Sequence, residues 1–226
     1  MQKRRAILSL LLLLPVPSLA VWAGMIAWPD TVLGKTLFAL SKVWILALPA
    51  VWYFGVERQR LSMRQPKIGG ILFGAASGLV LAVAIFAGYW IFGRTWIDPA
   101  LVKNLVAKVG LGRPAVYLAG AAYWVLVNAL LEEYVWRWFV FRQFRTFLPA
   151  MAAVAASALG FTLHHIVAMQ TYFSPLVTAI ASTGIFIGGS LWSLCCWQFG
   201  TIWPGYVSHA IVDIAIFAIG YHILFL

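Results

Sequence analysis

Residues 68–93, IGGILFGAASGLVLAVAIFAGYWIFG, contain no charged side chain. A helix of about 20 mostly apolar residues is long enough to cross the hydrocarbon core of a bilayer. Further runs of this kind occupy residues 6–28, 36–56, 115–141, 150–170, 174–198 and 201–224. Because these runs use most of the 226 residues, no soluble domain of useful size fits between them. The sequence therefore predicts one transmembrane domain over residues 1–226, an all-α polytopic membrane helical bundle of about seven to eight transmembrane helices.

The composition excludes a soluble protein. Hydrophobic residues make up 63% of the chain and charged residues only 10%, whereas a soluble domain carries about 25% charged residues. The net charge of +10 would suit a nucleic acid, but the basic residues lie in short segments that flank the apolar runs, as the positive-inside rule predicts. We therefore expect contact with membrane lipids and no nucleic acid partner. The flanking basic residues are Lys3, Arg4, Arg5, Arg58, Arg60, Arg64, Lys67, Arg142 and Arg145.

The first apolar run resembles a signal peptide, because a basic start is followed by Leu10 to Leu14 and then by PSLA at residues 17–20. However, the apolar sequence continues through Trp28, which is long enough to span a bilayer. We therefore expect a retained helix with its N-terminus inside. A compact basic bundle of this kind predicts a multi-pass protein of a prokaryotic cytoplasmic (inner) membrane.

Two features of the remaining sequence allow alternative interpretations. Residues 94–114 contain Lys103 and Lys108 with Leu and Val between them, which is compatible with an amphipathic helix on the membrane surface or with a solvated loop.

Small-residue stripes let helices approach closely in lipid. They favour packing within one chain, with a dimer seam as the alternative, so we expect a monomer or a weak homodimer. These stripes are Gly70, Gly74 and Gly78, and Gly184 and Gly188.

Polar clusters interrupt three of the apolar runs. The first is EEYVWR at residues 132–137. Residues four apart on a helix share a face, so Glu133 can pair with Arg137. Glu132 is turned by about 100° from Glu133 and cannot share Arg137 equally. The two acids are therefore expected to differ, with one neutralised by Arg137 and the other pointing elsewhere.

The same four-residue spacing occurs in the two later clusters. FTLHH at residues 161–165 places Phe161 and His165 on one face and turns His164 away. HAIVD at residues 209–213 places His209 and Asp213 on one face.

The ionisable members of these clusters lie near the middle of their runs. If each run is centred in the bilayer, they fall within about two turns of mid-depth. Burying them separately would cost several kcal/mol each, and convergence on one water-filled cavity removes most of that cost. We therefore expect the four to converge. They are Glu132, His165, His209 and Asp213.

Taken in order, the three clusters resemble the motifs of the CAAX protease and bacteriocin-processing family of glutamate intramembrane proteases, which includes the type II prenyl endopeptidases. That family is marked by E-E-x-x-x-R, F-x-x-x-H and H-x-x-x-N, or a variant of the last, on separate helices. Here the motifs begin at Glu132, Phe161 and His209, and WPG at residues 203–205 also resembles the family. The resemblance covers about residues 115–220, the core that carries the motifs.

The resemblance implies an intramembrane endopeptidase that hydrolyses a peptide bond with an activated water. Glu132, assisted by His165, would be the general base. His209 and Asp213 would stabilise the oxyanion. No cofactor is implied. Three further residues would hold and orient this catalytic set. They are Glu133, Arg137 and Phe161.

Asp213 departs from the family pattern, which usually has Asn at this position. An Asn can donate a hydrogen bond to an oxyanion, whereas an ionised Asp only accepts. Either Asp213 is protonated at membrane depth, or it orients His209, which then supplies the donor. We favour the second interpretation, because a carboxylate partner commonly orients an imidazole.

Two alternatives to a metal-independent protease remain. The first is a zinc-dependent protease that uses Glu132, His165, His209 and Asp213 as ligands, since histidines and carboxylates suit zinc, although H-E-x-x-H is absent. The second is a non-enzyme: a transporter, or a proteolytically inactive scaffold or immunity protein. A transporter is disfavoured because the short chain shows no repeated halves.

The sequence leaves the substrate open among a prenylated C-terminal peptide, a bacteriocin or pheromone precursor and another membrane protein. Three polar residues near the motifs stay outside the predicted catalytic set. Asn128, four residues before Glu132, either lines the same cavity or bonds a neighbouring helix. His164 is expected to pack or to line the cavity edge, and His222 to lie at the membrane interface.

Overall fold

The computed structural model describes residues 2–60 and 65–226, so Arg64 lies outside the described residues. Within these ranges the chain forms helices and no strand. Seven helical segments of the described chain are long and apolar enough to cross a membrane, which confirms the predicted all-α polytopic bundle. They are Gln2–Ala27, Val32–Val56, Ile68–Trp96, Pro114–Arg145, Ala150–Met169, Pro175–Phe199 and Trp203–Phe225.

Most of these segments join α-helical and π-helical stretches. The α-helices are α1 (Gln2–Leu13), α2 (Pro15–Trp22), α3 (Val32–Val51), α4 (Ile68–Gly88), α5 (Arg94–Trp96), α6 (Pro99–Lys108), α7 (Pro114–Tyr123), α8 (Ala129–Glu133), α9 (Arg142–Arg145), α10 (Ala150–Met169), α11 (Pro175–Phe199) and α12 (Trp203–Phe225). The π-helical stretches are Ala23–Ala27, Trp52–Val56, Tyr89–Gly93, Trp124–Asn128 and Tyr134–Phe141.

Local sequence signals set several helix ends. Thr31 caps α3, where its side chain accepts a hydrogen bond of 3.1 Å from the backbone N–H of Gly34. Asp98 caps α6 by accepting one of 2.9 Å from the N–H of Ala100. Gly200 ends α11 in a left-handed conformation with φ 67°, which glycine adopts without steric cost. Because α12 begins directly after this turn, His209 lies in its second turn.

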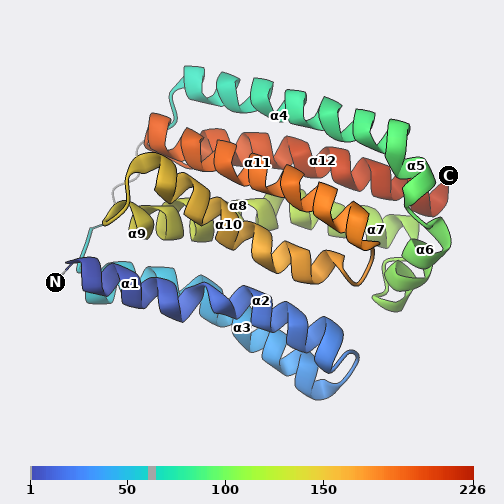
Figure 1. Cartoon of the computed structure of the whole chain (residues 1–226), viewed down its shortest axis with the longest axis horizontal. Coiled ribbons are helices and arrows are strands. Elements are labelled where there is room, and N and C mark those ends of the chain that lie inside the picture. Colours follow the sequence, from blue (N-terminus) through green and yellow to red (C-terminus); the bar gives the residue numbers. More distant parts are fainter. Residues whose placement is uncertain (1, 61–64) are drawn as a thin grey trace.

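The helices are arranged around a central set that carries all three motifs (Figure 1). In this view α4 lies at one edge and the hairpin of α1, α2 and α3 at the other, with α8, α10, α11 and α12 between them. The buried core of this central region includes Leu13, Trp136, Phe139, Phe161 and Trp192. Leu13 comes from the first run, so this run packs into the same core as the motif helices.

The first glycine stripe packs within the chain. A Cβ atom on Gly78 would lie 2.9 Å from Cα of Ser208, and one on Gly74 would clash with the carbonyl of Pro204. Backbone contact between α4 and α12 therefore explains the stripe, as the favoured interpretation predicted. The second pair does not behave in this way, because Gly184 has no atom near its Cβ position and Gly188 faces Trp192 of its own helix.

The segment between the third and fourth spans contains a helix, which decides between the two predicted alternatives. This helix is α6, and it begins at Pro99 directly after its cap. Val102 is buried, whereas Leu101 is exposed. The position of α6 on the membrane surface stays a prediction.

Candidate active site

The paired glutamates lie in α8, a short α-helical stretch between two π-helical ones, Trp124–Asn128 and Tyr134–Phe141. π-Helical turns are rare, and they are frequent at functional sites. Each such turn shifts the face that the following residues present. No sequence pattern predicted them, and they make the orientation of Glu132 and Glu133 relative to the rest of their span differ from that of a regular helix.

Glu132 is partly buried, with 19% of its side chain exposed. Nδ2 of Asn128 donates a hydrogen bond of 2.9 Å to its Oε1. Its Oε2 lies 3.6 Å from Nε2 of His209. Asn128 therefore contacts Glu132 from one helical turn earlier, and among the described residues its side-chain hydrogen bond goes to this glutamate rather than to a neighbouring helix.

Glu133 and Arg137 form a completely buried ion pair, with 3.1 Å between Oε1 and Nη1 and no exposed side-chain surface on either residue. This pairing was predicted from the four-residue spacing. The guanidinium group also donates a hydrogen bond of 3.2 Å to the carbonyl of Gly189. It lies over the rings of Phe161 and Trp192, at 4.4 and 5.0 Å from their centroids, where cation–π attraction adds to the pairing. The position of the Glu133 carboxylate is therefore fixed from several sides.

Gly205 of the WPG segment makes room for this carboxylate. A Cβ atom at Gly205 would lie 2.7 Å from Oε2 of Glu133, which is closer than real contacts allow. The glycine is therefore required by close approach between α12 and α8. The same contact brings the following turn of α12, with His209, toward the glutamates.

His209 is buried, with 4% of the residue exposed, and stacks on Trp192 with 3.8 Å between ring centroids. Its Nδ1 lies 3.1 Å from Oε1 of Glu133. Its Nε2 lies 3.6 Å from Glu132 and 3.8 Å from Oδ1 of Asp213. The expectation that Asp213 orients His209 is therefore not supported by the geometry. The orienting hydrogen bond comes from Glu133, because Arg137 holds that carboxylate against Nδ1.

His165 lies on α10 with Nδ1 at 2.8 Å from the carbonyl oxygen of Phe161. A carbonyl only accepts, so Nδ1 carries the hydrogen, and in the neutral ring the lone pair belongs to Nε2. Phe161 also packs its ring on His165, with 4.6 Å between centroids. Its backbone and side chain together set the tautomer and the orientation of this histidine.

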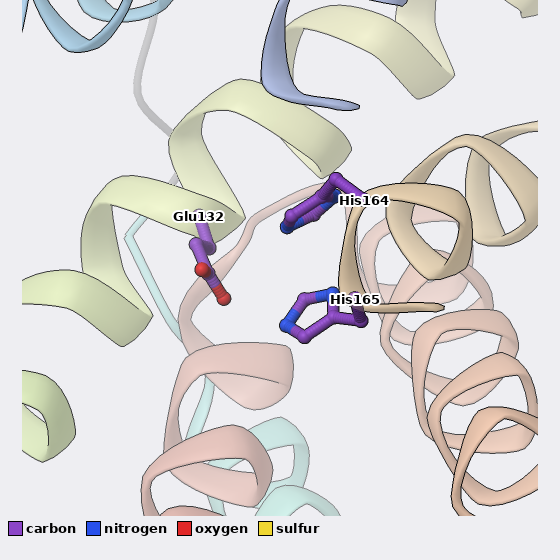
Figure 2. A group of neighbouring side chains, drawn as sticks. All are labelled: Glu132, His164 and His165. Carbon is purple, nitrogen blue, oxygen red and sulfur yellow. The ribbon is translucent and has the colours of Figure 1, made fainter. Parts of the chain in front are cut away.

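His164 packs against an aromatic ring, as one expectation had it, but it does not point away from the cluster as its position on the helix predicted. Its ring centroid lies 4.1 Å from that of His165, and its ring stacks on Trp136 with an interplanar angle of 2°. Figure 2 shows the carboxylate of Glu132, from α8, directed toward both imidazole rings, which come from consecutive residues of α10. The sequence offered only the histidine doublet as a signal for this contact.

Residues 114–215 match the family model described as type II CAAX prenyl endopeptidase Rce1-like. This segment is similar to that family. The predicted resemblance over about residues 115–220 is therefore confirmed. No curated protein and no solved structure shows significant similarity to the chain. The Rce1-like family is a family of membrane endopeptidases, and with seven membrane-length apolar helices in its described part the protein is an integral, multi-pass membrane protein.

The Rce1-like segment contains every residue predicted for the site, and the structure brings them together from α8, α10 and α12 and the π-helical stretch after α8. Glu132, His165 and Asp213 are partly exposed. The remaining members of the predicted set are buried, namely Glu133, Arg137, Phe161 and His209. His222 lies outside this cluster, against Tyr89 and Trp90. The roles of these residues stay predictions.

The possible metal ligands differ from the predicted set. Within the described ranges, the only group of three or more histidine, cysteine or acidic side chains close enough to share an ion is Glu132, His164 and His165. Their ligand atoms all lie within 4.8 Å of one another. His209 and Asp213, which were predicted as zinc ligands, are not part of this group, although Nε2 of His209 lies 3.6 Å from Oε2 of Glu132 and 3.8 Å from Oδ1 of Asp213.

Proposed function

We propose that the protein is an intramembrane endopeptidase in which Glu132 and His165 activate a water molecule. The observation that carries this proposal is the meeting of Glu132, His165 and His209 from three helices inside the Rce1-like segment. The family supports hydrolysis of peptide bonds at a membrane in general. The proposed role of each residue rests on the hydrogen-bond donors and acceptors that its side chain presents.

Glu132 and His165 together present two acceptors to the same space. Asn128 fixes Oε1 of Glu132, and the hydrogen bond to Phe161 leaves Nε2 of His165 without a hydrogen. A water held there donates one hydrogen to the carboxylate and one to the imidazole, so its oxygen lone pair points outward. As this oxygen attacks the carbonyl carbon of a peptide, Glu132 takes the proton and later gives it to the leaving amine.

His209 is placed to stabilise the oxyanion. Its Nδ1–H bonds to Glu133, and in the imidazolium form Nε2 carries a second hydrogen that faces Glu132 and Asp213. A substrate carbonyl oxygen that enters this space receives that hydrogen bond, which strengthens as negative charge develops. Stacking on Trp192 restricts the rotation of the ring. Asp213 then contributes charge near Nε2, or a hydrogen bond if it is protonated.

The substrate class follows from the membrane setting. The cluster lies within helices that are apolar enough to span a bilayer, so a peptide bond must reach it from a membrane-associated or lipidated chain. We propose such a peptide or protein as the substrate and the prokaryotic cytoplasmic membrane as the location. Basic segments on both sides of the apolar runs suit anionic lipid headgroups.

The test is cleavage of a quenched reporter peptide by the purified protein in lipid vesicles. Glu132→Gln keeps the size of the side chain and removes the base, so we expect a loss of about 1000-fold or more in kcat/KM. Asp98→Asn is the matched control, because it removes a carboxylate far from the cluster while keeping an oxygen that caps α6. Equal cleavage by wild type and Glu132→Gln would exclude Glu132 as the base, and no cleavage by the wild type would exclude the proposal and favour an inactive scaffold or immunity protein.

The zinc-dependent alternative is tested in the same assay. Activity that survives exhaustive treatment with a chelator supports the metal-independent mechanism. Activity that is lost with the chelator and restored by zinc supports the alternative. A comparison of membrane-fraction proteomes with and without Glu132→Gln identifies the natural substrate, because the uncleaved precursor accumulates in the variant.

A further inference from the structure

His164 and His165 direct two imidazole rings toward one carboxylate, although neighbouring residues on a helix diverge by about 100°. Their ring centroids are 4.1 Å apart, and both rings lie on the side of α10 that faces Glu132 (Figure 2). Trp136 and Phe161 enclose the pair, since Trp136 stacks on His164 and Phe161 packs on His165. Two aromatic walls therefore maintain a convergence that the helix alone would not produce.

The ligand atoms of this cluster are available. The hydrogen bond from Nδ1 of His165 to Phe161 leaves Nε2 as a lone-pair donor. Nδ1 of His164 is buried and lies beside the backbone of Gly160, one turn earlier on α10, without a hydrogen bond of good geometry, so Nε2 is the nitrogen of His164 that remains for an ion. Asn128 occupies Oε1 of Glu132, so Oε2 is the oxygen that remains for another contact.

We propose that Glu132, His164 and His165 bind Zn²⁺, and that the ion inhibits the protease by displacing the water that Glu132 and His165 activate. Two imidazoles and one carboxylate form a ligand set that zinc prefers, and three protein ligands leave one position open. The ligand atoms lie within 4.8 Å of one another. In a tetrahedral zinc site with bonds of about 2.1 Å, the ligand atoms would be about 3.4 Å apart. Small rotations of the side chains bring them to this separation.

Inhibition follows from competition for the same lone pairs. Oε2 of Glu132 and Nε2 of His165 cannot both accept hydrogen from a water and bind an ion. His164 contributes only to the ion, because the proposed water activation does not use it. This second part of the proposal rests on the proposed function, whereas the binding of the ion does not.

The binding test uses purified full-length protein in detergent and titrates it first with Co²⁺ and then with Zn²⁺. We expect visible absorption of tetrahedral Co²⁺ at one ion per chain, displaced by Zn²⁺. His164→Asn should lower the affinity for both ions by on the order of 100-fold. His222→Asn is the matched control, because His222 is also a histidine of a membrane helix but packs against Tyr89 and Trp90. The affinity of this variant for Co²⁺ and Zn²⁺ should equal that of the wild type. Thermal unfolding of each variant verifies the fold, and Glu132→Gln provides a second ligand variant with the same expected loss.

The activity test measures reporter cleavage against zinc concentration after chelator treatment. Zinc should inhibit the wild type and the His222→Asn variant with the affinity found by titration. Whatever activity His164→Asn retains should require on the order of 100-fold more zinc for inhibition.

Each part of the proposal has its own refutation. Absence of stoichiometric binding in the wild type, or unchanged binding in His164→Asn, would overturn the site itself. Zinc that activates instead of inhibiting would overturn the inhibitory role and the metal-independent mechanism, and it would leave the site standing. An enzyme without protease activity under any condition would refute the proposed function alone, since the titration is read without substrate.

Discussion

Replacement of Asp213 by Asn tests how the site stabilises an oxyanion. The Asp213 carboxylate lies 3.8 Å from Nε2 of His209, beyond a hydrogen bond. With an effective dielectric constant of about 20, unit charges at that distance interact by about 4 kcal/mol. In Asp213→Asn the imidazolium loses this attraction, but a nearby oxyanion is relieved of a repulsion of similar size. The Asn side chain also adds a donor, and a hydrogen bond to a charged group contributes about 1.5–3 kcal/mol.

The lost attraction and the relieved repulsion nearly cancel, so we expect Asp213→Asn to keep at least about a tenth of the wild-type kcat/KM, and the added donor can raise kcat/KM above that of the wild type. Asp213→Leu has a similar volume but neither charge nor donor, and its kcat/KM should fall by about 100-fold to 1000-fold. The assay is reporter cleavage in vesicles under chelator, with thermal unfolding in detergent to verify that both variants fold. Loss of activity in Asp213→Asn as complete as in Glu132→Gln would refute this reasoning, because the carboxylate itself would then be required.

Three further substitutions test the supports of the site and the fold. Gly205→Ala introduces a methyl group 2.7 Å from a buried carboxylate oxygen, so we expect at least about a tenfold fall in kcat/KM together with a lower unfolding temperature; normal values for both would contradict the close approach. Gly74→Ala should destabilise the α4–α12 contact by about 1–3 kcal/mol, whereas Gly69→Ala, with open space at its Cβ position, should unfold like the wild type. Asn128→Ala removes a hydrogen bond of 2.9 Å to Glu132, and since such a bond contributes about 0.5–1.5 kcal/mol, we expect kcat/KM to fall by about threefold to tenfold; an unchanged kcat/KM would show that this bond does not position the base.

The spans were predictable from the sequence because bilayer thickness sets a minimum length of apolar helix. The run at residues 68–93 becomes the span Ile68–Trp96, and the run at 201–224 becomes Trp203–Phe225. The π-helical stretches around α8 were not predictable, because they depend on how the span packs against its neighbours rather than on a repeating pattern in it.

The site was predictable to the extent that one helix determines its geometry. The Glu133–Arg137 pair follows from the four-residue spacing, and the structure contains it. The bond between Glu133 and His209 joins two helices that are 76 residues apart in the chain, so no local pattern encodes it. The spacing within α10 predicted that His164 would point away from the cluster. This prediction was wrong for a related reason, because Trp136, on which its ring stacks, belongs to another span.

The buried pair of Glu133 and Arg137 has a consequence for how the chain enters the membrane. Both charges lie on one span, four residues apart, so this pair can neutralise itself within the span before α10 and α12 have been synthesised. Two separate charges at that depth would each oppose insertion by several kcal/mol. His209 arrives later on the last span and meets a carboxylate that is already held in place. The order of the chain thus allows the polar centre to be assembled one helix at a time inside the lipid.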